Sequence, residues 1–367
     1  MPGVRCQQGR LRKDRSLTIS RPEAQRIRDL ALEAGFARAG FARSGRVPAG
    51  PFEADFPSPG PQASILVCCL SCYRREPDDL STPDDPHGLI APFARRNYYK
   101  TAVRMLRTLA ARLEAEMGIA GKSCRVFCNS RAPEKPLCVE AGLAWPGNNG
   151  LCIAPGLGSL FVIAGLVIPA ALHNEAAPGE LPQRCGSCRQ CMDACPTGAI
   201  LRPGVVDRSR CLQDHAARAD VLAPEVMEKR GARLYGCQDC QSVCPHNKGL
   251  AREGPPALGE IGPSVSLRWF LSLDGARVQA LFRGTTMGMS WISRDALVRN
   301  AIIAAGNSGN GALVDCVEPF VASSSAAVSR AASWALERMS GGRVQGRVQR
   351  RPGAGLSAGL PQRRQGL

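Results

Sequence analysis

The sequence of 367 residues predicts three successive folded parts: an α/β domain, a ferredoxin-like domain for two iron–sulfur clusters, and an α-helical domain of HEAT-like repeats. Three observations predict this class. Apolar strands alternate with amphipathic helices in the first half, eight regularly spaced cysteines follow, and short helical segments fill the last third. We place the domains at 18–180, 181–250 and 251–340, with disordered ends at 1–17 and 341–367.

The α/β domain begins with a capped helix. Ser20 and Glu23 have the spacing of a capping box, which predicts the start of a helix. Gly35 ends this predicted helix. The segment 36–42 then has the composition of a strand. After a loop rich in proline and glycine, the continuous apolar run 64–73 predicts a buried strand.

A long amphipathic helix is expected over 95–116, because its apolar residues recur with helical period. Further strands are expected at 125–128, 151–154 and 159–168, with the glycine-rich segment 140–149 as a connection. The alternation of strands and helices therefore predicts an α/β domain with a central sheet.

Eight cysteines between Cys185 and Cys244 have the spacing of a two-cluster ferredoxin. The first run is Cys-x2-Cys-x2-Cys-x3-Cys-Pro, the second is Cys-x2-Cys-x3-Cys-Pro, and Cys211 stands alone between them. In the bacterial ferredoxin spacing, three cysteines hold one [4Fe–4S] cluster and the fourth ligates the other. We assign Cys185, Cys188, Cys191 and Cys244 to cluster I, and Cys195, Cys211, Cys237 and Cys240 to cluster II.

Zinc sites and disulfides are the alternatives to iron for these cysteines. Zinc leaves the third cysteine of the first run unexplained, and we expect a reducing compartment because the chain shows no secretory signal. Among the other nine cysteines, Cys68, Cys69 and Cys72 stand close together in a strand-like apolar run. We expect them to fill the core rather than to bind a third metal.

The last third predicts a stack of short helices. They follow a linker rich in proline and glycine at 251–264, and fragments rich in glycine, asparagine and serine separate them. Antiparallel pairs of this kind are typical of HEAT-like repeats. The helices are expected at 267–273, 278–282, 294–305, 313–322 and 326–339.

The net charge of +16 is concentrated at the two ends of the chain. The basic remainder fits an anionic partner such as RNA, or serves solubility alone. No apolar run reaches the about 18 residues of a membrane helix. We therefore expect a cytoplasmic protein without a membrane partner.

Taken together, these motifs resemble epoxyqueuosine reductase, over roughly residues 20–340. That family combines a cobalamin-binding α/β domain, two [4Fe–4S] clusters and HEAT-like helices, and it reduces epoxyqueuosine in tRNA to queuosine. The resemblance implies cobalamin, a tRNA substrate and an unidentified low-potential electron donor. The matching pieces are RNYYKTAVRMLRTLAARL at 96–113, EAGLAWPGNN at 140–149, CGSCRQCMDACPTGAI at 185–200, YGCQDCQSVCPHN at 235–247 and RNAIIAAGN at 299–307.

The chain departs from the family pattern where the family has its proposed general acid. The family's Asp-Ser-Ala-Pro is replaced by NSRAP at 129–133, and the amide of Asn129 cannot donate a proton as an acid does. We predict Asn129 and Tyr98 as catalytic residues: Asn129 orients the substrate, and Tyr98 or water supplies the proton. The other candidate donors are Tyr99, Glu134 and His215.

The resemblance also implies that Gly142, Trp145, Gly147 and Asn149 border the corrinoid, with glycines that permit close approach of the macrocycle. The alternative is an ordinary tight loop around a buried tryptophan. Electrons would pass from one cluster to the other and then to cobalamin, which carries the difficult chemical step.

Two other functions stay open. One is a corrinoid and iron–sulfur reductase for another substrate, which Asn129 and the altered stretch after Cys211 (LQDHAARAD) favour. The other is a two-cluster electron carrier that is not an enzyme. Retention of a bound corrinoid after desalting separates the enzymes from the carrier.

Overall fold

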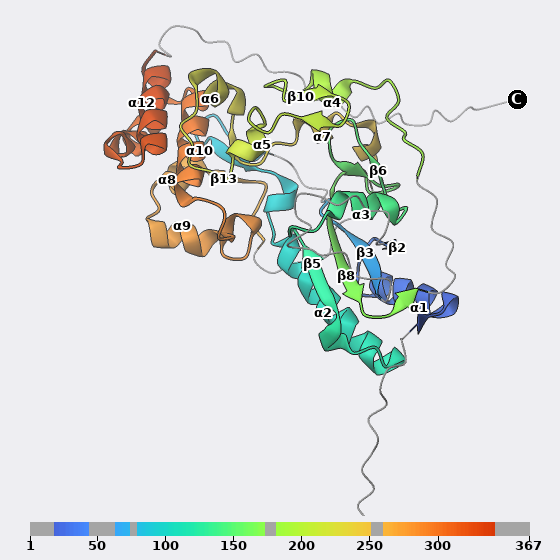
Figure 1. The fold of residues 1–367 in the computed structure, drawn as a ribbon. Coiled ribbons are helices and arrows are strands. Elements are labelled where there is room, and N and C mark those ends of the chain that lie inside the picture. Colours follow the sequence, from blue (N-terminus) through green and yellow to red (C-terminus); the bar gives the residue numbers. More distant parts are fainter. Residues whose placement is uncertain (1–17, 44–62, 74–78, 173–180, 251–259, 342–367) are drawn as a thin grey trace, which may run out of the picture.

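The computed structural model describes residues 18–43, 63–73, 79–172, 181–250 and 260–341. The predicted disordered ends, apart from Gly341, and most of the predicted linker at 251–264 lie outside these ranges. Figure 1 shows the N-terminal sheet with its helices at the lower right and the C-terminal helices at the left. The cysteine-bearing segment runs across the top of both.

A four-stranded antiparallel sheet forms the centre of the N-terminal part. Its order is β2 (Arg38–Ala42), β3 (Ser64–Ser71), β8 (Phe161–Ile168) and β5 (Arg125–Cys128). The expected strands are confirmed to within a few residues. The alternation along the chain did not predict strand direction, and every pairing in this sheet is antiparallel.

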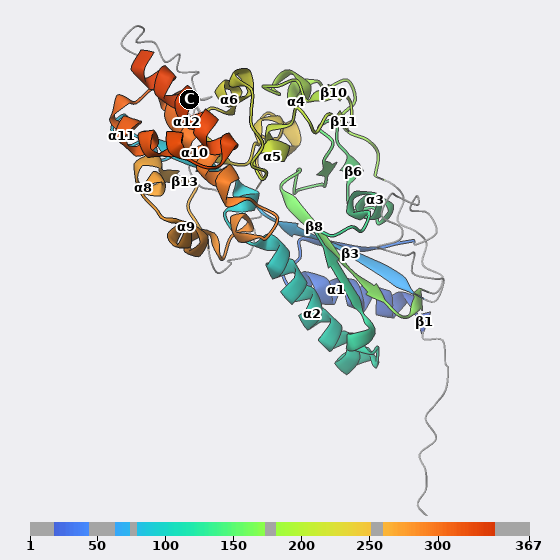
Figure 2. The ribbon, with the colours of Figure 1, turned by 60° about the vertical axis from the view of Figure 1, so that its left-hand side comes forward.

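Helices cover both faces of this sheet (Figure 2). α1 (Arg21–Glu33) and α2 (Tyr98–Met117) pack on one face, and α3 (Glu134–Glu140) packs on the other. Side chains of β3 alternate between the two cores, which explains its uninterrupted apolar sequence. Cys68, Cys69 and Cys72 are at most 3% exposed, so their predicted role as core residues is confirmed.

The first residues of α1 and α2 are fixed by side-chain caps. Asn97 caps α2, its side chain accepting a hydrogen bond from the amide of Lys100 (2.9 Å). The helix therefore begins at Tyr98, slightly later than predicted. The capping box at the start of α1 is confirmed, since the amide and hydroxyl of Ser20 both donate to the carboxylate of Glu23.

A three-stranded sheet joins parts of the chain that are far apart in sequence. β4 (His87–Ile90) pairs in parallel with β12 (Arg233–Tyr235) and antiparallel with β13 (Ser264–Ser266). The predicted domain boundaries at 180 and 250 therefore separate strands that share a sheet. We expect this sheet to hold the three parts in a fixed arrangement around the cysteine segment.

The C-terminal part is helical, as predicted. α10 (Arg294–Ser308) lies at its centre and packs on α12 (Ala326–Gly341), α8 (Leu267–Leu271), α6 (Pro224–Arg230) and β12. α9 (Gly275–Phe282) and α11 (Val314–Val317) complete the group. No helix within the described ranges has the length and hydropathy of a membrane span.

Short elements make up the rest of the described chain. They are β1 (Thr18–Ile19), β6 (Trp145–Pro146), β7 (Cys152–Ile153), β9 (Ala171–Leu172), α4 (Gln190–Asp193), β10 (Ile200–Arg202), β11 (Val205–Val206), α5 (Leu212–His215) and α7 (Asp239–Ser242).

Candidate functional site

The two cysteine runs form similar loops, each built around a four-residue helix. In the first, the amide of Cys188 donates to the carbonyl of Cys185 (3.0 Å) and α4 follows. In the second, α7 precedes Cys244. α4 and α7 contact each other, and Cys191 and Cys240 share a small apolar cluster there. The two runs therefore lie side by side.

The thiols of the first predicted set affect one another's charge. Burial raises the pKa of Cys244, and the charges of Cys185 and Cys188 add to the effect. Burial also raises the pKa of Cys191, with Cys188 and Cys244 contributing. These four cysteines, the cluster I set, are thus close neighbours. Mutual repulsion of thiolates is relieved when they bind a cationic metal centre.

The second predicted set is brought together in the same way. Burial raises the pKa of Cys240 to about 12, and the charges of Cys237, Cys191, Cys211 and Cys195 add to it. Burial also raises the pKa of Cys237, and Cys211 is among the charges that contribute. Cys195, Cys211, Cys237 and Cys240 are called the cluster II set below. The charge of Cys191, a member of the cluster I set, also raises the pKa of Cys240, so the two sets lie next to each other.

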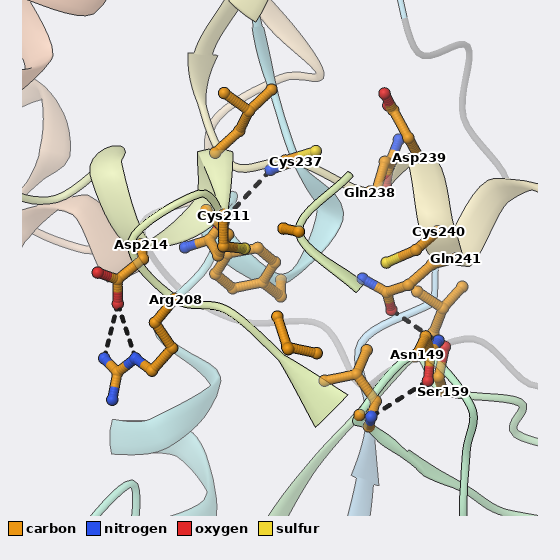
Figure 3. A pocket seen from close by; sticks show the side chains of 18 of the residues that line it. Asn149, Ser159, Arg208, Cys211, Asp214, Cys237, Gln238, Asp239, Cys240 and Gln241 are labelled. Carbon is orange, nitrogen blue, oxygen red and sulfur yellow. Dashed lines mark hydrogen bonds and ion pairs between the residues drawn. The ribbon is translucent and has the colours of Figure 1, made fainter. Parts of the chain in front are cut away.

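A cavity of about 720 Å³ lies beside the cluster II set. All four cysteines of that set line it, whereas its described lining contains no member of the cluster I set. Figure 3 shows Cys211, Cys237 and Cys240 on this wall. The facing wall comes from β8 and its preceding loop, where Ser159 donates to Gln241 (3.2 Å). This size suits a large ligand.

The cavity receives Tyr99 and not the predicted Tyr98. Tyr98 is 1% exposed and packs in the core between α2 and the sheet. Tyr99 lines the cavity, its ring 6.4 Å from that of Trp291. Tyr98 lies on the buried face of α2 together with Ala102 and Leu106, which the sequence pattern did not reveal. Burial raises the pKa of Tyr99 well above its usual value, so its hydroxyl stays protonated.

Asn129 and Glu134 both line the cavity, from the turn between β5 and α3. Asn129 has φ 48°, in the left-handed region that asparagine tolerates better than most residues. The amide and hydroxyl of Ser130 donate to Glu134 Oε1 (2.9 and 3.2 Å). Burial outweighs these bonds and raises the pKa of Glu134 to about 7. Such a carboxyl group can act as a general acid near neutral pH.

Of the four residues expected to border a corrinoid, only Asn149 is among the residues described as lining the cavity. Trp145 is buried against Cys244 of the cluster I set, and its ring lies 5.0 Å from that of His246. A side chain at Gly147 would collide with Ile153, and Gly142 has φ 64°. Packing and backbone conformation thus account for both glycines.

His215 lies outside the cavity lining and organises the loop after Cys211. Its Nε2 is hydrogen-bonded to the carbonyl of Ser209 (2.7 Å). This bond joins the two ends of the turn that carries Cys211, so we assign His215 a structural role.

The RNAIIAAGN segment of α10 holds the chain around the cluster II set, a role that its helical pattern did not predict. Arg299 donates to the carbonyls of His215 and Asp220 (both 2.6 Å). Asn300 donates to the carbonyls of Ala216 and Leu234 (3.0 and 2.9 Å). The buried helix α10 therefore fixes β12 and the segment 215–220 that precedes it.

The eight cysteines, four of them on a cavity wall, agree with the predicted class, a two-cluster iron–sulfur oxidoreductase. The family model described as 4Fe-4S double cluster binding domain matches residues 184–247. The chain is 31% identical over 361 residues to an epoxyqueuosine reductase of Xanthomonas campestris pv. campestris, covering 88% of this chain and 98% of that protein. It therefore belongs to the epoxyqueuosine reductase family.

Other comparisons agree. An epoxyqueuosine reductase of Burkholderia pseudomallei is 34% identical over 247 residues, which cover 64% of this chain and 56% of that protein. A solved epoxyqueuosine reductase with a tRNA-Tyr epoxyqueuosine-modified stem loop superposes with a TM-score of 0.74 at 22% identity, covering 86% of this chain and 89% of that chain. This likeness shows the fold. As a family member, the chain is an oxidoreductase with a domain for two [4Fe–4S] clusters.

Proposed function

We propose that this chain reduces the epoxide of epoxyqueuosine in tRNA to the alkene of queuosine. The observation that carries the proposal is the cavity, because the cluster II set and a carboxyl group of raised pKa surround one space. Removal of the epoxide oxygen as water consumes two electrons and two protons. The two clusters would supply the electrons, Glu134 would supply the first proton, and water would supply the second through Glu134.

The cluster I set would hold the cluster that receives electrons, and the cluster II set would hold the cluster next to the cavity. The cluster I set lies away from the cavity lining, where a low-potential donor protein of unidentified nature would reach it. Cys191 and Cys240, one from each set, are neighbours. The two clusters are then close enough for rapid electron transfer.

Cobalamin fits the cavity as the group that meets the substrate. The volume of about 720 Å³ accommodates much of a flat macrocycle, and apolar residues such as Phe161 and Val162 supply a wall beside the cluster II set. Asn149 and Tyr99 are the polar residues that would hold its edge. When bound, cobalamin supplies the low-valent metal nucleophile for the epoxide, and the chain orients the substrate and delivers protons.

Glu134 replaces the acid that is missing at Asn129. The carboxyl proton of Glu134 goes to the epoxide oxygen as its bond to carbon breaks, and water then reprotonates the carboxylate. The amide of Asn129 orients the substrate by hydrogen bonds. The hydroxyl of Tyr99 is a weaker acid, because burial raises its pKa.

A tRNA substrate agrees with the charge of the chain. The net charge is +16, and Arg208, with a side chain that is 80% exposed, belongs to the cavity lining. Asp214 holds this guanidinium in place (2.6 Å), as Figure 3 shows. Arg208 is therefore a fixed cation for a phosphate next to the cavity.

The remaining expectations belong to the same proposal. The pair α10 and α12 is compatible with a HEAT-like repeat, and a tRNA-modifying reductase with reduced clusters suits the cytoplasm. The predicted division at 180 and 250 then separates cofactor, cluster and helical regions, with β4, β12 and β13 joining them.

The test is single-turnover reduction of epoxyqueuosine in a tRNA stem loop by anaerobic, reduced, cobalamin-loaded protein. We expect queuosine from the unmodified chain, and a faster rate from Asn129→Asp, because a second acid then faces the substrate. Absence of product from both proteins would refute this substrate.

A second candidate is a corrinoid-dependent reductase for another substrate, which the amide of Asn129 on the cavity wall favours. Retention of corrinoid without product from epoxyqueuosine would support it. Failure to retain a corrinoid would instead indicate a two-cluster electron carrier.

A further inference from the structure

Arg230 is a buried cation without an ion-pair partner in the part of the chain that the structure describes. The residue is fully buried at the end of α6. Its guanidinium donates to the carbonyls of Leu212 (3.2 Å) and Arg233 (3.3 Å), and its Nε is buried without a hydrogen-bond partner. Burial of a charge without a counter-charge costs several kcal/mol, so this position requires an explanation.

No carboxylate compensates Arg230 in the described chain. Burial lowers the pKa of Arg230, the cations Arg299 and Arg233 lower it further, and only a negative charge on Cys237 would raise it. Arg233 differs, because its guanidinium pairs with both oxygens of Asp239 (2.6 and 2.7 Å). The unpaired cation is thus the one that donates to the carbonyl of Leu212, the residue after Cys211, and whose pKa a charge on Cys237 affects.

We propose that Arg230 is the buried counter-ion of cluster II and raises the reduction potential of that cluster. A [4Fe–4S] cluster with four thiolates is an anion, and reduction adds one further negative charge. A fixed cation behind the cluster stabilises the reduced form more than the oxidised form. The cluster in turn supplies the negative charge that Arg230 lacks. This inference rests on the two-cluster assignment and not on the substrate.

The consequence is a direction for electron flow. Cluster II lies between cluster I and the cavity, and Arg230 stands behind the cluster II ligands at the carbonyl of Leu212. A potential raised at this cluster favours transfer from cluster I toward the cavity. Arg230 is therefore a residue that sets a potential, and it is not itself among the residues that line the cavity.

The experiment is a redox titration of the anaerobic full-length protein, followed by electron paramagnetic resonance, for the unmodified chain and Arg230→Met. Methionine is of similar length and suits a buried apolar site. We expect one of the two reduction steps to shift to lower potential. The expected shift corresponds to a tenfold change in the reduced-to-oxidised ratio, about 59 mV for one electron. The other step should not move.

Arg218→Met is the matched control. It removes the same charge near the same loop, but the Arg218 side chain is 54% exposed and pairs with Asp214 and Asp220. Water and these carboxylates screen it, so both reduction steps should stay in place. Unchanged potentials in Arg230→Met with both clusters present, or an equal shift in Arg218→Met, would overturn the inference.

Arg230→Lys covers the case in which the methionine variant loses iron. Retention of cluster II by the lysine variant alone supports a requirement for charge, whereas equal loss in both variants shows a requirement for shape and refutes the proposal. The titration needs no tRNA. Failure of epoxyqueuosine reduction with a normal Arg230 effect would therefore remove only the proposed substrate.

Discussion

The two cysteine runs have similar sequence spacing, but the cluster I set and the cluster II set have different surroundings. The cluster I set lies against the indole of Trp145, outside the cavity lining. The cluster II set forms a wall of the cavity and has the buried cation Arg230 behind it. Cysteine spacing thus specifies which residues bind iron, and the surrounding residues specify what each cluster does.

Loss of one ligand from each set should give the largest effect. Cys211→Ala should remove cluster II and abolish reduction, because the cluster next to the cavity is lost. Cys185→Ala should remove cluster I and leave cluster II able to accept electrons from a small-molecule reductant. Iron analysis should give about eight irons in the unmodified chain and about half in each variant.

Single-turnover assays with a chemical reductant then separate the two variants. Equal loss of activity and indistinguishable spectra in Cys185→Ala and Cys211→Ala would contradict the crossed assignment and the different positions of the two sets.

Glu134→Gln should lower the single-turnover rate by about 10²- to 10⁴-fold, the usual contribution of a positioned acid. Glutamine can still accept the hydrogen bonds from Ser130, so the turn should keep its shape. In the unmodified chain the rate should fall as the pH rises through about 7, because Glu134 loses its proton there. The variant should show no such inflection.

Tyr99→Phe is the control for this effect, since it changes another cavity hydroxyl. If Tyr99→Phe changes the pH dependence of the rate and Glu134→Gln does not, the tyrosine supplies the proton.

The sequence predicted the double [4Fe–4S] domain and most elements because both depend on local spacing. It did not predict which tyrosine faces the cavity, because Tyr98 and Tyr99 are adjacent and the apolar pattern of the helix did not separate them. It predicted Trp145 beside the corrinoid. In the structure Trp145 lies in β6, which pairs with β7, and its side chain packs at the cluster I set. The sequence pattern did not indicate that Arg230 is buried, because a basic residue at the end of a short helix is normally exposed.

Addition of Asn129→Asp to Glu134→Gln should restore part of the lost activity. Aspartate tolerates the left-handed backbone at this position about as well as asparagine. Both residues line the same cavity, so the new carboxyl group can replace the missing acid. The expected recovery is smaller than the loss, about tenfold, because Asn129 is more exposed to water and a solvated aspartate is mostly ionised near pH 7. A double variant no faster than Glu134→Gln would show that Asn129 does not face the reacting oxygen.

Trp145→Phe should give the smallest effect, and this effect should be confined to cluster I. The indole nitrogen is buried and has no hydrogen-bond partner in the described chain, although the ring packs beside Cys244. We expect its N–H to donate to a sulfur of cluster I, which stabilises the reduced cluster. Phenylalanine keeps an aromatic ring and removes the donor, so the potential of cluster I should fall by less than Arg230→Met lowers that of cluster II. Trp291→Phe, a change on the cavity wall, should leave cluster I unchanged. A shift of cluster II in Trp145→Phe would show that the two sets do not have separate environments.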